Sequence, residues 1–455
     1  MLPFYKKVSY GMGRFGSSFL LTLTGLTAFW IYGTVFELNW FLDGIALATS
    51  YVVIGLTHWF IGFRSDKTET RWGRRKPYVI IGAPGLAITG FLIFVPNWFI
   101  DTADLSLQYV IFGYYLLFIC AFKFFYAFLL TAFQAWMPEI TDEDERPLVS
   151  SMQNTANWIA NGLGVVIGFV TPLFFVALPS PGLSSIGFMI VLLFAIITVL
   201  FYLPSIAFIR EKPDIVMPKR SMREETKTVL ENPVYVKWVL IVGFLSFSFS
   251  AITTQIVGYS QSVLLLTSME LLLPPAIGLL ISIIIFLYLW IRMIRRIGKG
   301  RLMMYSLFFL ALLMAMTPVV GWLAGVISNV VVAFFYFIPL AACMAVYYLM
   351  SYIVPADIVH VDELQTGMSR AGMYEGFKGV PLNIFQAITA LVLGWFMDFS
   401  VASTGSEIFG YLWWGPLFAP FLLVAAWILR STNIDPNFEA LKAQAAPTTA
   451  PPAQE

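Results

Sequence analysis

Charged and polar side chains interrupt long apolar segments of this 455-residue sequence, at positions where a polar solute or an ion could bind. Lys123 lies fourteen positions before Met137, the last residue of an apolar segment at 107–137. In a membrane helix that separation is about 21 Å, past mid-membrane, where a charge costs about 2.5–3.5 kcal/mol. Thr131 and Gln134 continue the same helical stripe. Lys123 and Gln134 are therefore candidate solute-binding residues; the alternative for Lys123 is a side chain that extends to the outer interface.

A second polar stripe lies in the apolar segment 149–177. Gln153 and Asn157 are four positions apart, and Asn161 continues the line. Exposure of such a polar stripe to lipid would cost free energy, so we expect it to face a neighbouring helix or a cavity. Helix–helix hydrogen bonding and solute binding both remain open as explanations.

A third stripe, in the segment 10–36, is formed by Arg14, Ser18 and Thr22. These three side chains lie on one helical face. Arg14 is deep enough to reach a solute or a gate on the cytoplasmic side. All three are candidate substrate-binding residues.

Near the start of the segment 371–397, Glu375 and Lys378 are three positions apart and can neutralise each other on one helix. A structural or gating ion pair is as consistent with this spacing as a substrate contact. Asn383 and Gln386 follow deeper in the segment and are further candidate substrate-binding residues.

The composition indicates a multi-pass membrane protein. The chain is 59% hydrophobic, 17% aromatic and only 12% charged, and its mean hydropathy is +0.80. A soluble protein of this size would need a charged surface that so few residues cannot cover. The net charge of +1 gives no reason to expect a nucleic acid partner. Membrane lipid is the expected surrounding, in the cell (plasma or inner) membrane.

Helices of about 20 apolar residues span a bilayer, and the sequence predicts an all-α membrane protein with twelve transmembrane helices. The predicted spans are 10–36, 42–63, 77–98, 107–137, 149–177, 183–209, 234–260, 268–293, 302–325, 328–354, 371–397 and 406–430. The loops after every odd-numbered span contain none of the 27 Lys and Arg residues. Because cytoplasmic loops carry the excess of Lys and Arg, both termini are predicted to be cytoplasmic.

The polar connection 210–233 divides the spans six and six. We expect an N-terminal six-helix bundle at 1–209, a cytoplasmic linker at 210–233 and a C-terminal six-helix bundle at 234–430. The Pro-, Ala- and Thr-rich tail at 431–455 is predicted to be disordered.

Two loops repeat at equivalent places in these halves. RWGRRK (71–76) follows the second span and RIGKGR (296–301) follows the eighth, 225 positions later. PEITDEDER (138–146) and PADIVHVDE (355–363) end the fourth and tenth spans, 217 positions apart. Repeats in the same orientation are a known transporter construction, so the pattern favours two similar six-helix halves.

Four motifs carry a family resemblance over residues 5–400: YGMGRFG (10–16), GFRSDKTETRWGRRKP (62–77), WMPEITDEDER (136–146) and ADIVHVDELQTGMSRAGMY (356–374). They resemble the major facilitator superfamily and, within it, the glycoside–pentoside–hexuronide (melibiose-permease-like) cation symporters. The resemblance implies the MFS fold and secondary transport. It also implies a cytoplasmic gate in which Asp66 pairs with Arg74 and Arg75.

The charged sites of that family are mostly replaced here. Its two cation-binding acids in the second span fall at Ile54 and His58, and its other charged site residues fall at Ser18, Leu130, Gln153 and Asn383. Sodium favours oxygen ligands, usually with a carboxylate, so sodium coupling by the family route is not expected. Proton coupling through His58 or the Glu375–Lys378 pair and uncoupled facilitation both remain open.

The predicted function is secondary transport of a sugar, glycoside or related polar solute by alternating access, by a monomer. The alternative with the same fold is a carrier of an amphiphile, such as a lysolipid or a drug. No enzyme activity, metal or cofactor is expected, because HExxH, P-loop, GxSxG and paired-Cys metal motifs do not occur at helix-compatible places.

Overall fold

Every long apolar segment of the sequence forms a helix in the computed structural model, because a chain in lipid must satisfy its backbone hydrogen bonds within the segment. The structure describes residues 3–66, 68, 70–142, 145–176, 181–209, 227, 230–366 and 371–436. Most of the predicted linker and of the predicted disordered tail lies outside these residues.

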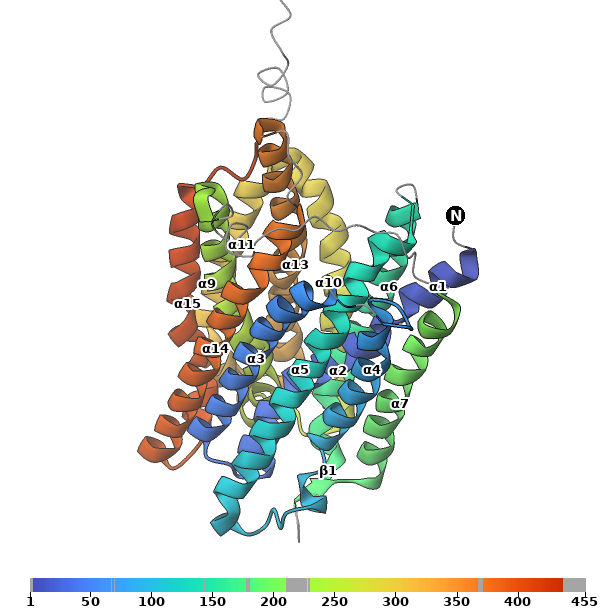
Figure 1. The fold of residues 1–455 in the computed structure, drawn as a ribbon. Helices are drawn as coiled ribbons and strands as arrows, with labels where there is room; N and C mark the ends of the chain where they lie inside the picture. Colours follow the sequence, from blue (N-terminus) through green and yellow to red (C-terminus); the bar gives the residue numbers. More distant parts are fainter. Residues whose placement is uncertain are drawn as a thin grey trace, which may run out of the picture.

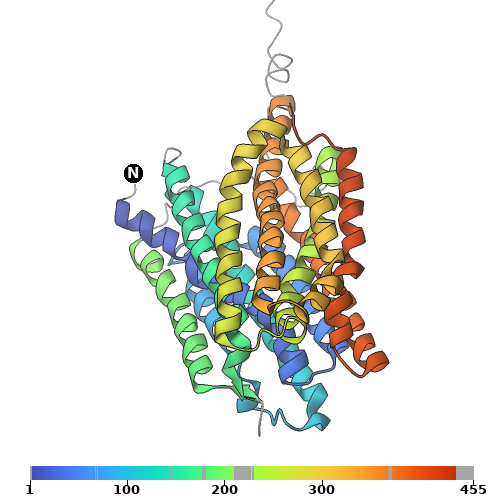
Figure 2. The same cartoon turned by 180° about the vertical axis from the view of Figure 1, so that it is seen from behind.

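The helices run up and down through a single bundle (Figure 1). Those before the linker are α1 (Phe4–Met12), α2 (Arg14–Trp30), α3 (Trp40–Asp66), α4 (Lys76–Leu92), α5 (Gln108–Ile140), α6 (Arg146–Val170) and α7 (Ser185–Phe208). Those after it are α9 (Pro233–Gly258), α10 (Met269–Ile297), α11 (Lys299–Ala315), α12 (Thr317–Ala324), α13 (Asn329–Thr366), α14 (Ala371–Thr404) and α15 (Ile408–Arg430). Figure 2 shows the bundle from behind, with α7 (green) and α15 (red) at opposite edges.

Short elements connect the helices at one end of the bundle. The antiparallel strands β1 (Phe175–Val176) and β2 (Gly182–Leu183) form a small hairpin there. Short 3-10 turns lie beside it: η2 (Pro96–Trp98), η3 (Leu105–Leu107) and η5 (Thr171–Phe174). We call this end the acidic face, because Asp104, Asp398 and Glu407 lie there. The opposite end, which carries α1 and the loop containing Arg75, is the basic face (top of Figure 1).

Ten helices of the described residues are long and apolar enough to cross a membrane. The pair α11 and α12, bent by 49°, forms an eleventh candidate, and α4 is apolar but shorter. Each of the twelve predicted segments coincides with one of these elements. The predicted multi-pass helical fold is therefore confirmed, while the count of twelve spans and the cytoplasmic termini stay predictions.

Two helices end in the same way at the acidic face. α2 continues into the π-turn η1 (Ile31–Val35), and α9 continues into the π-turn η6 (Tyr259–Val263), 228 positions later. The residue that follows the C-cap of each π-turn has a positive φ, 50° at Glu37 and 53° at Leu265. Non-glycine residues rarely adopt this region. The backbone thus repeats an uncommon detail at the offset expected for two similar halves.

Side-chain contacts follow the same repeat. The Tyr32 hydroxyl in η1 donates to the carbonyl oxygen of Ile93, just beyond α4, at 2.9 Å. The Tyr259 hydroxyl in η6 donates to the carbonyl oxygen of Thr317, where α11 gives way to α12, at 2.7 Å. In each case the hydroxyl of a buried tyrosine bonds a backbone carbonyl at the end of a neighbouring helix; that of Ile93, at the C-terminal end of α4, is one that the helix leaves without an intrahelical partner.

The acidic face is closed where α3 meets α14. A Cβ added to Gly44 would lie 2.6 Å from the carbonyl oxygen of Ala390 and 2.9 Å from the Cα atom of Gly394. Only two facing glycines allow backbones to approach this closely. The glycine pair therefore joins residues of the two predicted halves at this end.

Gly44→Val is expected to hold the acidic face open, since the added side chain cannot fit against Ala390. Spin labels at Phe41→Cys and Val401→Cys, both exposed positions flanking this contact, report the distance across it once Cys120 and Cys343 are replaced by serine. Gly44→Val should convert most of a short-distance population into a longer one. Gly113→Val, where an added Cβ meets nothing within 4 Å, is the control. Identical distance distributions in the two variants would contradict the closure.

Candidate functional site

A buried cation lies at the contact between α3 and α5. Lys123 of α5 is only 4% exposed, and its ammonium lies 4.7 Å from the centre of the Tyr51 ring of α3. The negative face of an aromatic ring attracts a cation, by about 2 kcal/mol when desolvated. No carboxylate forms an ion pair with Lys123 among the described residues. Its ammonium therefore retains N–H donors for a solute.

His58 lies two turns further along α3 on the same face. Its Nδ1 atom is 2.7 Å from the Thr131 hydroxyl, which itself donates to the carbonyl oxygen of Ala127. Because that hydroxyl has one proton and gives it to Ala127, it must accept from His58. The imidazole therefore carries a proton on Nδ1, which leaves Nε2 as the atom that gains or loses the second proton.

The second predicted half completes this junction. The Tyr51 hydroxyl interacts with Ser250 of α9, and Gly55 of α3 packs against the Asn383 side chain of α14. Asn383 donates its amide to the carbonyl oxygen of Gly379 on its own helix, at 2.7 Å. We call the group formed by Tyr51, His58, Lys123, Ser250 and Asn383 the central junction. It joins polar side chains from four helices.

The polar stripes of α2 and α6 face each other. Ser18 donates to Asn157 at 2.6 Å, and Thr22 donates to Asn161 at 2.9 Å. These hydrogen bonds join the two helices, so helix–helix bonding accounts for part of the stripe. Each hydroxyl donates to an amide oxygen, and the amide nitrogens have no hydrogen-bond partner among the described residues. The asparagines therefore still offer N–H donors.

Arg14 and Gln153 lie elsewhere, around Tyr10 near the basic ends of α2 and α6. Both interact with the Tyr10 hydroxyl, which donates to the carbonyl oxygen of Phe133. The remaining predicted residues are dispersed. Gln386 donates to Ser246 at 3.1 Å, and Gln134 is exposed although its predicted stripe neighbour Lys123 is buried. The side chains of Glu375, Lys378 and Asp66 lie outside the described residues.

The predicted gate arginines converge on a residue that the sequence did not single out. Glu139, near the end of α5, accepts from Arg74 and Arg75, each at 2.8 Å. Arg75 is 1% exposed and also donates to Ser65. All of these residues precede the linker, so the cluster ties α3, α4 and α5 together within one predicted half. In the other half Lys299 pairs with Asp357, as the repeated loop motifs suggest.

Glu139→Gln is expected to destabilise the protein, because it leaves the buried guanidinium of Arg75 without its carboxylate. Removing one partner of a buried ion pair costs about 3–5 kcal/mol, so the temperature of thermal unfolding should fall clearly. Glu231→Gln is the matched control, since its pair with Lys227 is exposed and 3.8 Å long and such pairs contribute little. Equal unfolding temperatures for the two variants would contradict this role of Glu139.

At the acidic face, side chains join the two predicted halves. Glu407, which precedes α15, accepts from Thr34 of η1 and from Ser262 of η6, each at 3.3 Å. Burial raises the pKa of Glu407 above its ordinary value, while these two hydrogen bonds lower it. A carboxylate therefore links both π-turns when the face is closed.

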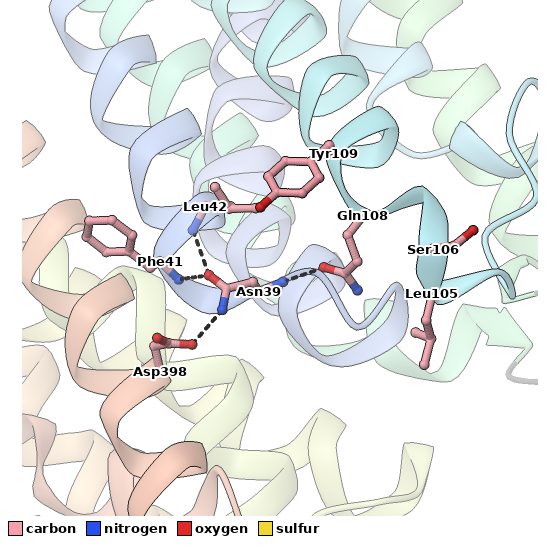
Figure 3. A pocket seen from close by; sticks show the side chains of 8 residues that line it. All are labelled: Asn39, Phe41, Leu42, Leu105, Ser106, Gln108, Tyr109 and Asp398. Carbon is pink, nitrogen blue, oxygen red and sulfur yellow. Dashed lines mark hydrogen bonds between the residues drawn. The ribbon is translucent and has the colours of Figure 1, made fainter.

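A pocket of about 580 Å³ also lies at the acidic face, lined by residues that include Asn39, Gln108 and Asp398. Asn39 lines this pocket; its side-chain amide donates to Asp398 at 2.6 Å, and its backbone N–H donates to Gln108 at 2.9 Å (Figure 3). The side-chain amide oxygen of Asn39 also caps α3 by accepting from the backbone N–H groups of Phe41 and Leu42. Because these polar groups are already paired with one another, they leave few hydrogen-bonding groups for a ligand. We therefore do not assign a binding site to this pocket.

Residues 9–429 match the family described as MFS/sugar transport protein. A lactose permease of Lactobacillus delbrueckii subsp. bulgaricus is 30% identical over 204 residues, which cover 43% of this chain and 32% of the permease. An isoprimeverose transporter of Lactiplantibacillus pentosus is 24% identical over 253 residues, 54% of this chain and 50% of that protein. The chain thus spans half or less of the length of these curated relatives.

Two solved structures share the fold. A D-xylose–proton symporter matches with a TM-score of 0.65 and 11% identity, over 94% of this chain and 97% of its own. The nucleoside transporter NupG matches with a TM-score of 0.63 and 13% identity, over 94% and 98%. At this identity the similarity concerns the fold alone.

Proposed function

Since this chain belongs to the family of MFS/sugar transport proteins, we propose that it is a secondary transporter of a sugar, glycoside or related polyhydroxylated solute. The solute binds between residues 1–209 and 234–430, which act as two six-helix halves, and crosses the membrane by alternating access. The central junction is the observation that carries this proposal.

The junction offers what a sugar requires. Lys123 presents ammonium donors on a buried stem, and Tyr51 holds that ammonium in place through its ring. Outside the junction, Asn157 and Asn161 present further amide N–H groups on α6, where it meets α2. A solute rich in hydroxyl oxygens accepts from such donors, and a few placed polar groups within apolar walls are typical of small-molecule sites. The named substrates of the relatives, lactose and isoprimeverose, belong to this chemical class.

The closed acidic face supports alternating access. Hydrogen bonds from Asn39 to Asp398 and from Thr34 to Glu407 cross between the predicted halves, together with the Gly44–Gly394 contact. Such contacts must separate when the face opens. By the distribution of Lys and Arg, the basic face is cytoplasmic, so this structure is closed toward the outside. The transporter acts as a monomer in the cell membrane.

Lys123→Met is expected to weaken sugar binding about tenfold or more, because hydrogen bonds to a charged group contribute about 1.5–3 kcal/mol. Binding is measured by thermal shift of the purified protein with D-xylose, isoprimeverose and lactose, and with a lysolipid as the amphiphile. Lys237→Met is the control, since Lys237 donates to Ser431 at the basic face.

Sugar protection of Lys123→Cys from alkylation gives an independent check on the same site, with Cys120 and Cys343 replaced by serine and with the sugar concentration raised to offset the weaker binding expected without the ammonium. If the lysolipid stabilises the protein and no sugar does, the solute is an amphiphile and the sugar proposal is wrong.

Proton coupling is proposed through His58, whose fixed Nδ1 proton leaves Nε2 to take up the second. His58→Ala should abolish accumulation of sugar against its gradient under an imposed pH difference in proteoliposomes. Exchange of labelled for unlabelled sugar should continue, because exchange needs no net proton movement. Equal uphill accumulation by the variant and the unmodified protein would remove His58 as the coupling residue. If the unmodified protein itself accumulates no sugar against its gradient under the imposed pH difference, the protein is an uncoupled facilitator.

A further inference from the structure

Asp43 is a fully buried carboxylate that the proposed transport site does not use. It is the fourth residue of α3 and is 0% exposed. Neither of its oxygens has a hydrogen-bond partner among the described residues. An isolated carboxylate buried in this way is very unfavourable, and such a group takes up a proton instead of keeping its charge.

The start of α3 cannot supply the missing partners. The N–H groups of Phe41 and Leu42 are taken by Asn39, and the N–H of Asp43 itself donates to the Asn39 carbonyl at 3.0 Å. The favourable end of the helix dipole is thus present, but its donors are already in use.

Neighbouring helices bring hydroxyl groups and no cation. Tyr115 of α5 directs its hydroxyl toward the Asp43 carboxyl, without reaching the geometry of a formed hydrogen bond. Tyr32 and Tyr411 are also within electrostatic reach of Asp43. The Tyr32 hydroxyl donates to the carbonyl oxygen of Ile93. The hydroxyls of Tyr115 and Tyr411 have no hydrogen-bond partner among the described residues.

The other side chains named at this face, Glu407 and Asp398, are carboxylic acids and bring no positive charge. Glu407 interacts with Tyr411, and Asp398 accepts from Asn39. The connecting segments at this face contain no Lys or Arg. Neutralisation of Asp43 must therefore come from a bound proton, since a carboxylate with a few hydroxyl groups provides too few oxygen ligands for a metal cation.

The position of Asp43 links this proton to closure. The next residue, Gly44, forms the backbone contact with Gly394 that closes the acidic face. Separation of α3 from α14 would bring water to Asp43 and allow it to ionise, whereas closure buries it again. Burial favours the protonated, neutral carboxyl of Asp43. Because the two equilibria are linked, protonation of Asp43 in turn favours the closed conformation.

We propose that Asp43 is a proton-binding site whose occupancy controls the acidic face: the face closes when the carboxyl is protonated and opens when the carboxyl ionises. The proposal rests on the alternating access described above, and names the proton as a ligand of the outer gate. The carboxylate accepts one proton from water at the acidic face on closing and returns it there on opening.

The test measures the distance between spin labels at Phe41→Cys and Val401→Cys as a function of pH, without any sugar. Because Glu407 also titrates at this face, the measurements are made with Glu407→Gln, which keeps an acceptor for Thr34 or Ser262. If one proton is released on opening, the ratio of open to closed populations rises by up to about tenfold per pH unit. Adding Asp43→Asn, which resembles the protonated form, should keep the face closed at every pH.

Asp398→Asn in the same background is the matched control, because it removes a carboxyl group from this face outside the buried site. The ratio of open to closed populations should still depend on pH in this variant. Gel filtration and thermal unfolding show whether each variant folds, and Asp43→Glu, which retains a titratable carboxyl, should restore a pH-dependent ratio. A pH dependence that survives in Asp43→Asn, the absence of any pH dependence in Glu407→Gln, or closure driven by Na⁺ in place of H⁺ would each overturn the proposal. Since no sugar is present, these outcomes are independent of whether the sugar proposal holds.

Discussion

A charge enclosed in an apolar bundle must find its compensation within the protein, and three charges of this molecule do so in different ways. Arg75 shares the carboxylate of Glu139 with Arg74 and is a fixed part of the framework. Among the described side chains, Lys123 is compensated by the ring of Tyr51 alone, so its donors stay available. Asp43 has no ionic partner among the described residues. The degree of compensation therefore separates the parts that stay constant from those that respond to a ligand.

Much of the fold could be predicted because it depends on local properties. Runs of apolar residues set the helices, and the asymmetric placement of Lys and Arg distinguishes the two faces. The repeated loop motifs were also visible in the sequence. Each repeat contributes an ion pair at the basic face, Arg74–Glu139 in one predicted half and Lys299–Asp357 in the other. Gly73 and Gly298 both have a positive φ, which explains why a glycine stands at the same place in the two motifs.

The site could be predicted only in part, because it depends on which helix faces meet. Periodicity places Ser18 and Asn157 on stripes, but only the rotation of α2 against α6 shows that they bond to each other. The same rotation buries Lys123 and exposes Gln134. Asp43 did have a signal, as the one acid of the predicted span 42–63. A carboxylate in a first helical turn usually meets water, however, and its burial comes from Tyr115 and Tyr411, which are distant in sequence.

The π-turns that end α2 and α9 have a consequence for how the sequence tolerates change. A π-turn holds one residue more than the α-helical turn it replaces, so each is a place where a one-residue deletion could be absorbed without breaking the helix. Such a deletion would rotate everything beyond it by about 100°. A deletion early in η1 would carry Thr34 away from Glu407, and one early in η6 would carry Ser262 away from the same carboxylate. The length of these two turns thus fixes the angular register of the chain where both predicted halves meet Glu407 at the acidic face.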